Sequence, residues 1–97
     1  MPVSFDPAKS ERNQRERGLS FELVDRLDWS TALVKEDERR DYGETRLLVF
    51  GLIDQRLHVA VVTPRGEDLR VISLRKANRK EERLYGQETQ RPSRTPG

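Results

Sequence analysis

Residues 46–75 read RLLVFGLIDQRLHVAVVTPRGEDLRVISLR and carry the strongest structural signal in the chain. Three apolar runs, at 46–53, 57–63 and 69–75, are separated by short polar segments that contain turn-forming residues. Short connections join strands that lie side by side and run in opposite directions. We therefore predict three consecutive antiparallel strands, and a shorter strand at 32–36 that extends the sheet to four.

The first of these strands is apolar on both of its faces. Side chains alternate between the two faces of a strand, which divides six large apolar residues into two sets: Leu48, Phe50 and Leu52, and Leu47, Val49 and Ile53. Both faces of the sheet must be covered, because a small protein rarely leaves a large apolar patch in water. We expect N-terminal helices to cover one face, and the C-terminal helix, the acidic loop at 35–44 or another protein to cover the other.

Two helices are predicted before the sheet. Asp6 and Pro7 favour the start of the first helix, and Gly18 favours its end. Ala8 is its only apolar side chain after the proline, so we expect this helix to be loosely held.

The second helix is expected at 21–29, where Ser20 is a suitable capping residue. Phe21, Val24 and Leu27 follow one another at steps of three residues and would form one apolar face. This pattern indicates that the second helix packs on the sheet.

A third helix is predicted to follow the last strand. Asn78 and Glu81 have the spacing of a capping box, with Asn in place of Ser or Thr. Arg79 and Lys80 would then occupy the first turn, where the helix dipole disfavours cations. Since exposed N–H groups at a helix start can bind an anion, this placement favours an anion at that point.

The predicted fold class is therefore α+β, with two N-terminal helices, an antiparallel sheet of three to four strands and a short C-terminal helix. A chain of 97 residues has room for one such domain, which we place at residues 1–86. The last segment, 87–97, is polar and contains Pro and Gly, so we predict a disordered tail there.

The composition limits the classes of function. Charged residues make up 37% of the chain and hydrophobic residues only 33%, which is near the polar limit for globular proteins and favours a tail or a partner-dependent surface. The absence of cysteine excludes disulfides and thiolate zinc sites. No apolar run has the length of a signal peptide or a membrane span, so we expect a cytoplasmic protein.

Four motifs in a fixed order resemble one family. These are FDPAKSERNQRERGLSFE at 5–22, ETR at 44–46, TPRG at 63–66 and RVISLRKANRKEER at 70–83. Their order and spacing resemble the BrnT family of type II toxins, which are similar in fold to RelE-type ribonucleases.

The resemblance implies a RelE-like fold and a metal-independent endoribonuclease that inhibits translation and needs no cofactor. It also implies an RNA substrate and a cognate antitoxin, usually with a ribbon-helix-helix DNA-binding part, in a possible higher-order complex. Arg17 stands where the family commonly has His, and Leu47 and Val62 stand where it often has Tyr. Arg17 could bind phosphate but could not transfer a proton near neutral pH.

Cleavage of RNA by its own 2′-hydroxyl requires the extra charge on the pentavalent phosphate to be stabilised, and arginine suits this task. The catalytic candidates are Arg70, Arg75 and Arg79. The RNA-binding candidates are Arg17, Arg46, Lys76 and Lys80. Strict alternation places Arg70 and Arg75 on opposite faces of the strand, so they can share a face only if the strand twists or bulges between them.

Two alternatives remain open at this point. The arginines could form surface ion pairs with nearby carboxylates, namely Glu67, Asp68, Glu81 and Glu82. The domain could also be a module that binds RNA or a protein partner without catalysis. The single histidine, His58, lies within a predicted strand, where a packing role is commoner than a catalytic one.

Overall fold

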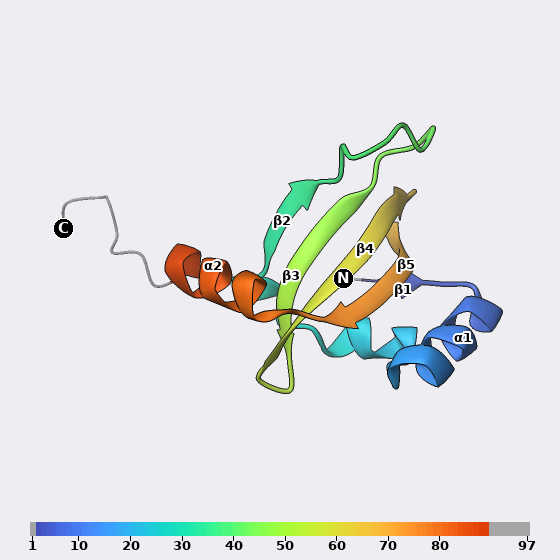
Figure 1. Ribbon diagram of the computed structural model, residues 1–97. Helices are drawn as coiled ribbons and strands as arrows, with labels where there is room; N and C mark the ends of the chain where they lie inside the picture. Colours follow the sequence, from blue (N-terminus) through green and yellow to red (C-terminus); the bar gives the residue numbers. More distant parts are fainter. Residues whose placement is uncertain (1, 90–97) are drawn as a thin grey trace.

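The computed structural model describes residues 2–89, in which a five-stranded sheet is flanked by helices (Figure 1). Along the chain the elements are β1 (Val3–Ser4), α1 (Pro7–Arg17), the 3-10 helices η1 (Phe21–Arg26) and η2 (Trp29–Thr31), β2 (Leu33–Glu36), β3 (Leu47–Ile53), β4 (Arg56–Arg65), β5 (Asp68–Lys76) and α2 (Arg79–Thr89). None of the helices within 2–89 is long and apolar enough to cross a membrane.

The strand order is β1-β5-β4-β3-β2, and the predicted α+β class is confirmed. β2, β3, β4 and β5 pair in antiparallel fashion, as predicted. The predicted count of three to four strands was wrong, because β1 adds a fifth strand that pairs parallel to β5. β1 contains only two residues, Val3 and Ser4, so no alternating pattern could reveal it.

Tight turns join the three long strands. Asp54 and Gln55 connect β3 to β4 with φ angles of 49° and 68°. Two consecutive positive φ values are typical of the hairpin turn whose twist matches that of the flanking strands. Gly66, at φ 59°, begins the turn between β4 and β5.

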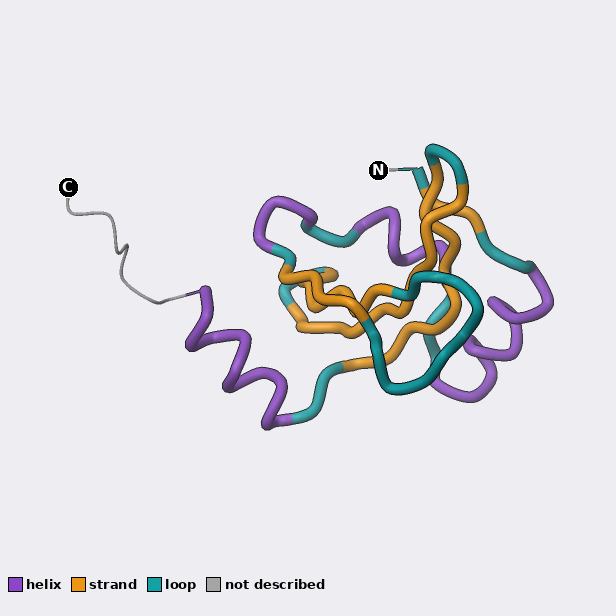
Figure 2. Tube along the Cα trace, turned by 90° about the horizontal axis from the view of Figure 1, so that it is seen from above, coloured by secondary structure: helices purple, strands orange, loops and turns teal. Residues whose placement is uncertain are grey.

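The N-terminal helices cover one face of the sheet, where the main core lies. Fully buried side chains meet there from both layers, including Phe21 and Val24 from η1, Val49 from β3, and Val62 and Leu74 from β4 and β5. Figure 2 shows η1 and η2 on one side of the sheet and α2 on the other. Of the three covers expected for the second face, namely the C-terminal helix, the acidic loop or another protein, α2 covers part of it through Tyr85.

The second predicted helix was wrong in type. Residues 21–29 do not form one α-helix, since η1 ends at Arg26, Leu27 is extended at φ −69° and ψ 135°, and η2 follows. A 3-10 helix has three residues per turn, so the three-residue step from Phe21 to Val24 suits it, and Leu27 lies just beyond its end. Ser20 Oγ accepts the N–H of Glu22, so the predicted cap is confirmed.

α1 begins and ends where predicted, but polar residues hold it. Asp6 caps its start and Gly18, at φ 72°, ends it. Its buried residues are Ser10 and Asn13. Ser10 Oγ accepts the N–H of Phe21 at 2.9 Å, which ties the helix to η1. The prediction of a loosely held helix was based on missing apolar residues and did not foresee these polar anchors.

α2 starts with the predicted capping box. Asn78 Oδ1 accepts the N–H of Glu81 at 2.8 Å, and Glu81 Oε1 accepts the N–H of Asn78 at 2.9 Å. The helix continues to Thr89, three residues into the segment predicted to be a disordered tail. The rest of that predicted tail, at 90–97, lies outside the described residues.

Candidate functional site

The face of the sheet opposite the N-terminal helices is only partly covered, and we call it the open face. A small cluster of Leu57, Val59 and Ala77 is buried there, with Phe50 and Tyr85 packed against it. Tyr85 OH donates to the carbonyl of Thr31 at 2.8 Å and thereby anchors α2 beside the sheet.

A shift in strand register sets which arginines reach the open face. Val61 pairs with Ser73 but Val62 pairs with Val71, which leaves one extra residue in β5. Farther along, Thr63 pairs with Arg70, and Val59 pairs with Arg75. Because partners across strands share a face, and Thr63 and Val59 are an even number of residues apart, Arg70 and Arg75 share the open face. The strand irregularity that the two arginines need in order to share a face is therefore present.

A hollow of about 260 Å³ lies on the open face, and we call it the basic hollow. It is lined by four cationic side chains, one carboxylate, one serine and four apolar side chains. The lining residues are Arg17, Lys35, Arg39, Leu48, Phe50, Val59, Val61, Ser73, Arg75 and Glu81. These cations come from α1, β2, the following loop and β5, so only the folded chain brings them together.

Arg75 is held by Glu81 at the start of α2. Its two terminal nitrogens donate to the two carboxylate oxygens at 2.8 and 2.7 Å. Arg75 hydrogen bonds lower the pKa of Glu81 to about 2, and the same contact raises the pKa of Arg75. The ion-pair alternative is therefore correct for Arg75 in this structure, although the forked geometry is also the one that binds a phosphate.

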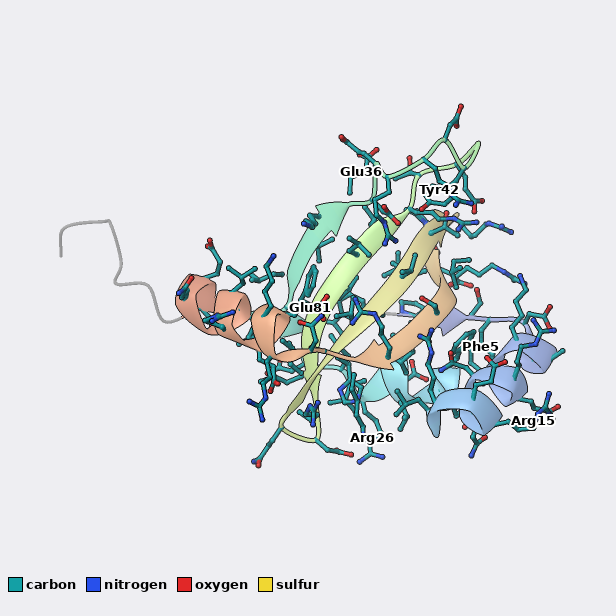
Figure 3. All side chains as sticks on the ribbon, viewed as in Figure 1. Phe5, Arg15, Arg26, Glu36, Tyr42 and Glu81 are labelled. Carbon is teal, nitrogen blue, oxygen red and sulfur yellow. The ribbon has the colours of Figure 1, made fainter. Side chains whose placement is uncertain are left out.

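The loop after β2 presents Arg39 at the rim. Asp37, whose side chain is only 1% exposed, accepts from Arg39 Nε and Nη2, each at 2.8 Å, and from the hydroxyl of Tyr42 at 3.0 Å. These hydrogen bonds, with that of Arg39 the strongest, hold the pKa of Asp37 well below its usual range. Figure 3 shows Tyr42 in this loop and Glu81 at α2. The loop is thus ordered by a buried carboxylate.

Two of the predicted RNA-binding residues lie at opposite ends of this region. Arg17 lines the basic hollow, and its Nη1 donates to the carbonyl of Leu74 at 3.4 Å. Arg46 lies at the base of the loop, with its guanidinium 4.1 Å from the ring centre of Tyr42 and a hydrogen bond to Glu44.

The other predicted residues do not converge on one point. Arg70 and Arg75 pair with β4 residues four positions apart, which is about 13 Å along a strand. Lys76 is adjacent to Arg75 and points to the other face by alternation. Arg79 and Lys80 are exposed in the first turn of α2, outside the lining of the basic hollow. The predicted cations are therefore spread along a strand and a helix turn instead of gathered at one point.

Sequence reasoning missed Lys35 and Arg39, which both line the basic hollow. They lie within the segment 35–44, which was described above as an acidic loop. Because carboxylates surround them in the sequence, they were not considered as cationic site residues. The short spacing of Asp37, Arg39 and Tyr42 is the available signal, since a buried carboxylate requires donors nearby.

His58 takes no part in the basic hollow. It is 4% exposed, its Nδ1 lies 2.7 Å from the carbonyl oxygen of Arg56, and burial lowers its pKa. Within residues 2–89 no group of three or more His, Asp or Glu side chains could hold a metal ion.

The Arg75–Glu81 pair makes stability depend on pH. We predict that the pair stabilises the fold above about pH 4.5, the ordinary pKa of glutamate, and that this contribution is lost as the pH falls through about 2. NMR titration of the Glu81 carboxyl measures this directly. In Arg75→Ala the pKa of Glu81 should rise toward its ordinary value, and an unchanged pKa would show that the pair does not form in solution.

Comparison with known families gives one match. The profile of a family described as "Ribonuclease toxin, BrnT, of type II toxin-antitoxin system" matches residues 5–81. This segment contains every residue that lines the basic hollow. A search of curated proteins found no match.

Proposed function

Because the chain belongs to the BrnT family of ribonuclease toxins of type II toxin-antitoxin systems, we propose that it is a metal-independent endoribonuclease that cuts RNA in the basic hollow and inhibits translation. We further propose that its fold is RelE-like, and that it acts in the cytoplasm. The observation that carries the proposal is the convergence of four cationic side chains on one hollow: Arg17, Lys35, Arg39 and Arg75.

Arginines in the basic hollow can stabilise the transition state. Attack of the 2′-hydroxyl gives a pentavalent phosphate with additional negative charge, and positioned cations near it lower the barrier. Arg75 is the best placed for this task, because its fork already holds the two oxygens of Glu81. A phosphate presents similar oxygens, so RNA would compete with Glu81 for Arg75.

A second candidate function follows from the residues that could transfer protons. The hollow is lined by neither histidine nor tyrosine, and its one carboxylate is held at a low pKa. A domain that binds RNA or its partner without cutting would need only the cations. Activity therefore decides between the two candidates.

The family implies a cognate antitoxin, and the open face is a suitable surface for it. Phe50 and Leu48 remain partly exposed there beside the basic hollow. We propose that an antitoxin, with a ribbon-helix-helix DNA-binding part, covers this surface and blocks the cations, in a complex that can be of higher order.

The test is incubation of the purified protein, free of any partner, with RNA in EDTA. We expect cleavage that leaves 2′,3′-cyclic phosphate ends, since no metal is required. Arg26→Ala is the control, because Arg26 also pairs with a carboxylate, that of Asp54, but lies outside the basic hollow. RNA that is bound but left intact would favour the second candidate. Cleavage that persists unchanged in Arg75→Ala would indicate a contaminating nuclease or a site elsewhere.

Expression alone should arrest growth, and a co-expressed antitoxin should relieve the arrest. Both the family and the partly uncovered apolar face motivate this prediction. Growth curves with and without the partner provide the measurement. Harmless overproduction of a stable, soluble monomer would contradict it.

A further inference from the structure

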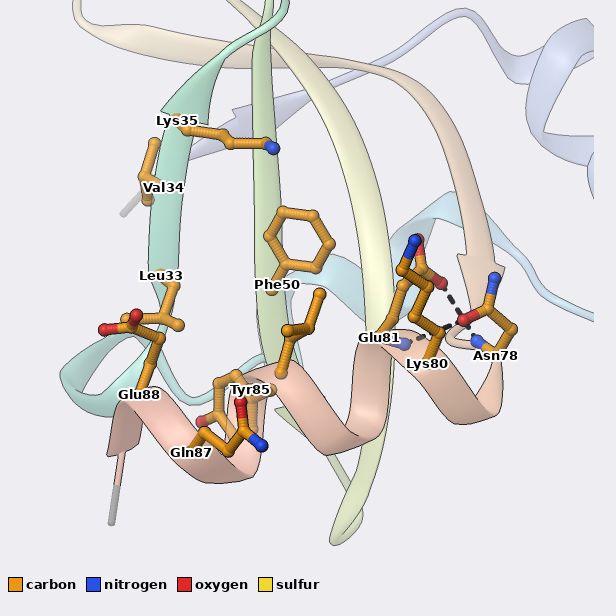
Figure 4. A pocket seen from close by; sticks show the side chains of 11 residues that line it. Leu33, Val34, Lys35, Phe50, Asn78, Lys80, Glu81, Tyr85, Gln87 and Glu88 are labelled. Carbon is orange, nitrogen blue, oxygen red and sulfur yellow. Dashed lines mark hydrogen bonds between the residues drawn. The ribbon is translucent and has the colours of Figure 1, made fainter. Parts of the chain in front are cut away.

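A second hollow adjoins the basic hollow, and we call it the apolar groove. It has a volume of about 540 Å³ and lies between β2 and α2 (Figure 4). Lys35, Phe50 and Glu81 line both hollows, so the two are neighbours. Figure 4 shows Phe50 rising from β3 between Lys35 above and α2 below.

The groove has apolar walls, and the charged side chains that line it are two lysines and two glutamates: Lys35, Lys80, Glu81 and Glu88. Val34 and Leu84 line it and are 51% and 50% exposed, and they are the exposed large hydrophobic residues found within 2–89. Lys35 Nζ lies 6.0 Å from the centre of the Phe50 ring, and Lys80 lines the groove from α2. Aromatic surface flanked by lysines is the combination that single-stranded nucleic acids bind.

We propose that the apolar groove receives an unpaired RNA base, stacked on Phe50, while an adjacent phosphate of the same strand occupies the basic hollow. This rests on the proposed function and adds a substrate subsite to it. Phe50 lines both hollows, so a base against its ring lies next to the phosphate that Arg75 and Arg39 would bind. A base has an apolar face and a ring that stacks on aromatic side chains.

The position of the apolar groove next to the basic hollow favours RNA over a protein segment as the occupant. A protein segment in the groove would need no cations beside it, whereas a base brings a phosphate on either side. Lys35 and Lys80 lie where such phosphates would pass. Tyr85 also lines the groove, and its hydroxyl bond to Thr31 fixes the wall that the base would contact.

Binding of modified RNA tests the proposal without relying on cleavage. A short RNA with a 2′-deoxy group at the scissile position cannot be cut by its own 2′-hydroxyl, and an abasic residue is moved along it one position at a time. We expect one position near the scissile phosphate where loss of the base weakens binding to the wild type by about 10-fold. In Phe50→Leu, removal of the same base should change RNA affinity little, because the ring on which the base stacks is already absent.

Two further variants separate stacking from damage to the fold. Phe50→Tyr keeps the aromatic ring, so the abasic residue should again weaken RNA binding as it does in the wild type. We call this loss of affinity the abasic penalty. Phe5→Leu makes the same change on the other side of the sheet, where Phe5 packs on Phe21, and should keep the penalty of the wild type. Thermal unfolding of each variant confirms that it is folded before binding is measured.

The outcomes distinguish this inference from the proposed function. An equal abasic penalty in wild type and Phe50→Leu, with RNA still cut by the wild type, overturns the base subsite alone. Weaker binding of the antitoxin to Phe50→Leu, with the RNA pattern unchanged, assigns the groove to the protein partner and also overturns it. A wild type that neither binds nor cuts RNA overturns both the subsite and the proposed function.

Discussion

Arg75→Ala should lower the rate of RNA cleavage by about 100-fold or more while changing RNA affinity much less. Arg75 is the arginine that reaches the basic hollow from β5 and holds two oxygens in a fork. Removal of one positioned donor of this kind costs about 3 to 4 kcal/mol of transition-state stabilisation. Single-turnover cleavage rates and binding to uncleavable RNA measure the two effects separately.

Three controls accompany this variant. Arg26→Ala removes an arginine that forms an exposed ion pair with Asp54 outside the basic hollow, and it should leave cleavage unchanged. Arg75→Lys keeps the charge but loses the fork, so it should recover little activity. Arg79→Ala removes an exposed cation of α2 and should mainly weaken RNA binding. The slope of log affinity against log salt concentration should fall in magnitude by about one. Equal rates in wild type and Arg75→Ala would remove the active site from this hollow.

Asn13→Ala should destabilise the protein by about 1–3 kcal/mol, although Asn13 lies on a helix with no apolar face. Its buried side-chain nitrogen donates to the carbonyls of Leu19 at 2.8 Å and Leu74 at 3.0 Å, so one amide joins α1, the segment before η1 and β5. Loss of the amide leaves the Leu19 carbonyl without this donor in a buried position, and an unsatisfied buried acceptor is costly. Chemical denaturation measures the change in unfolding free energy.

Gln14→Ala is the matched control for this prediction. Gln14 is the next residue of the same helix and is exposed, so its loss should change stability by less than about 0.5 kcal/mol. Equal stability of Asn13→Ala and the wild type would mean that α1 is held by other contacts. A further effect is expected on Arg17, which follows on α1 and also donates to Leu74, so RNA binding should weaken in Asn13→Ala.

Local patterns were enough to predict most of the fold. Alternating apolar residues fixed the three long strands, and the split of Val49 from Phe50 between the faces was correct, because the period of two depends on the backbone alone. The capping box of Asn78 and Glu81 was also readable, since both hydrogen bonds join residues three positions apart. Such contacts depend only on residues that lie within about one helical turn of each other.

The candidate site was predicted only in part. Arg17 and Arg75 line the basic hollow, but Arg46 and Arg70 do not, and neither do Lys76, Arg79 and Lys80. These three are near Arg75 in sequence, and nearness along the chain says little about which face or helix turn a side chain takes. Lys35 and Arg39 were missed because their neighbours are acidic.

The sequence by itself determined the three long strands, the turns between them, the helix caps and the family. Only the tertiary structure decided where the pairing between β4 and β5 shifts in register. This shift places Arg70 on the same face of the sheet as Arg75. The tertiary structure also decided the partners of Asp37, Asn13 and Glu81, which set the positions of the loop, α1 and α2. The physical reason is that a strand period or a cap depends on residues within a few positions. A register shift or a buried polar contact instead depends on which distant segments pack together.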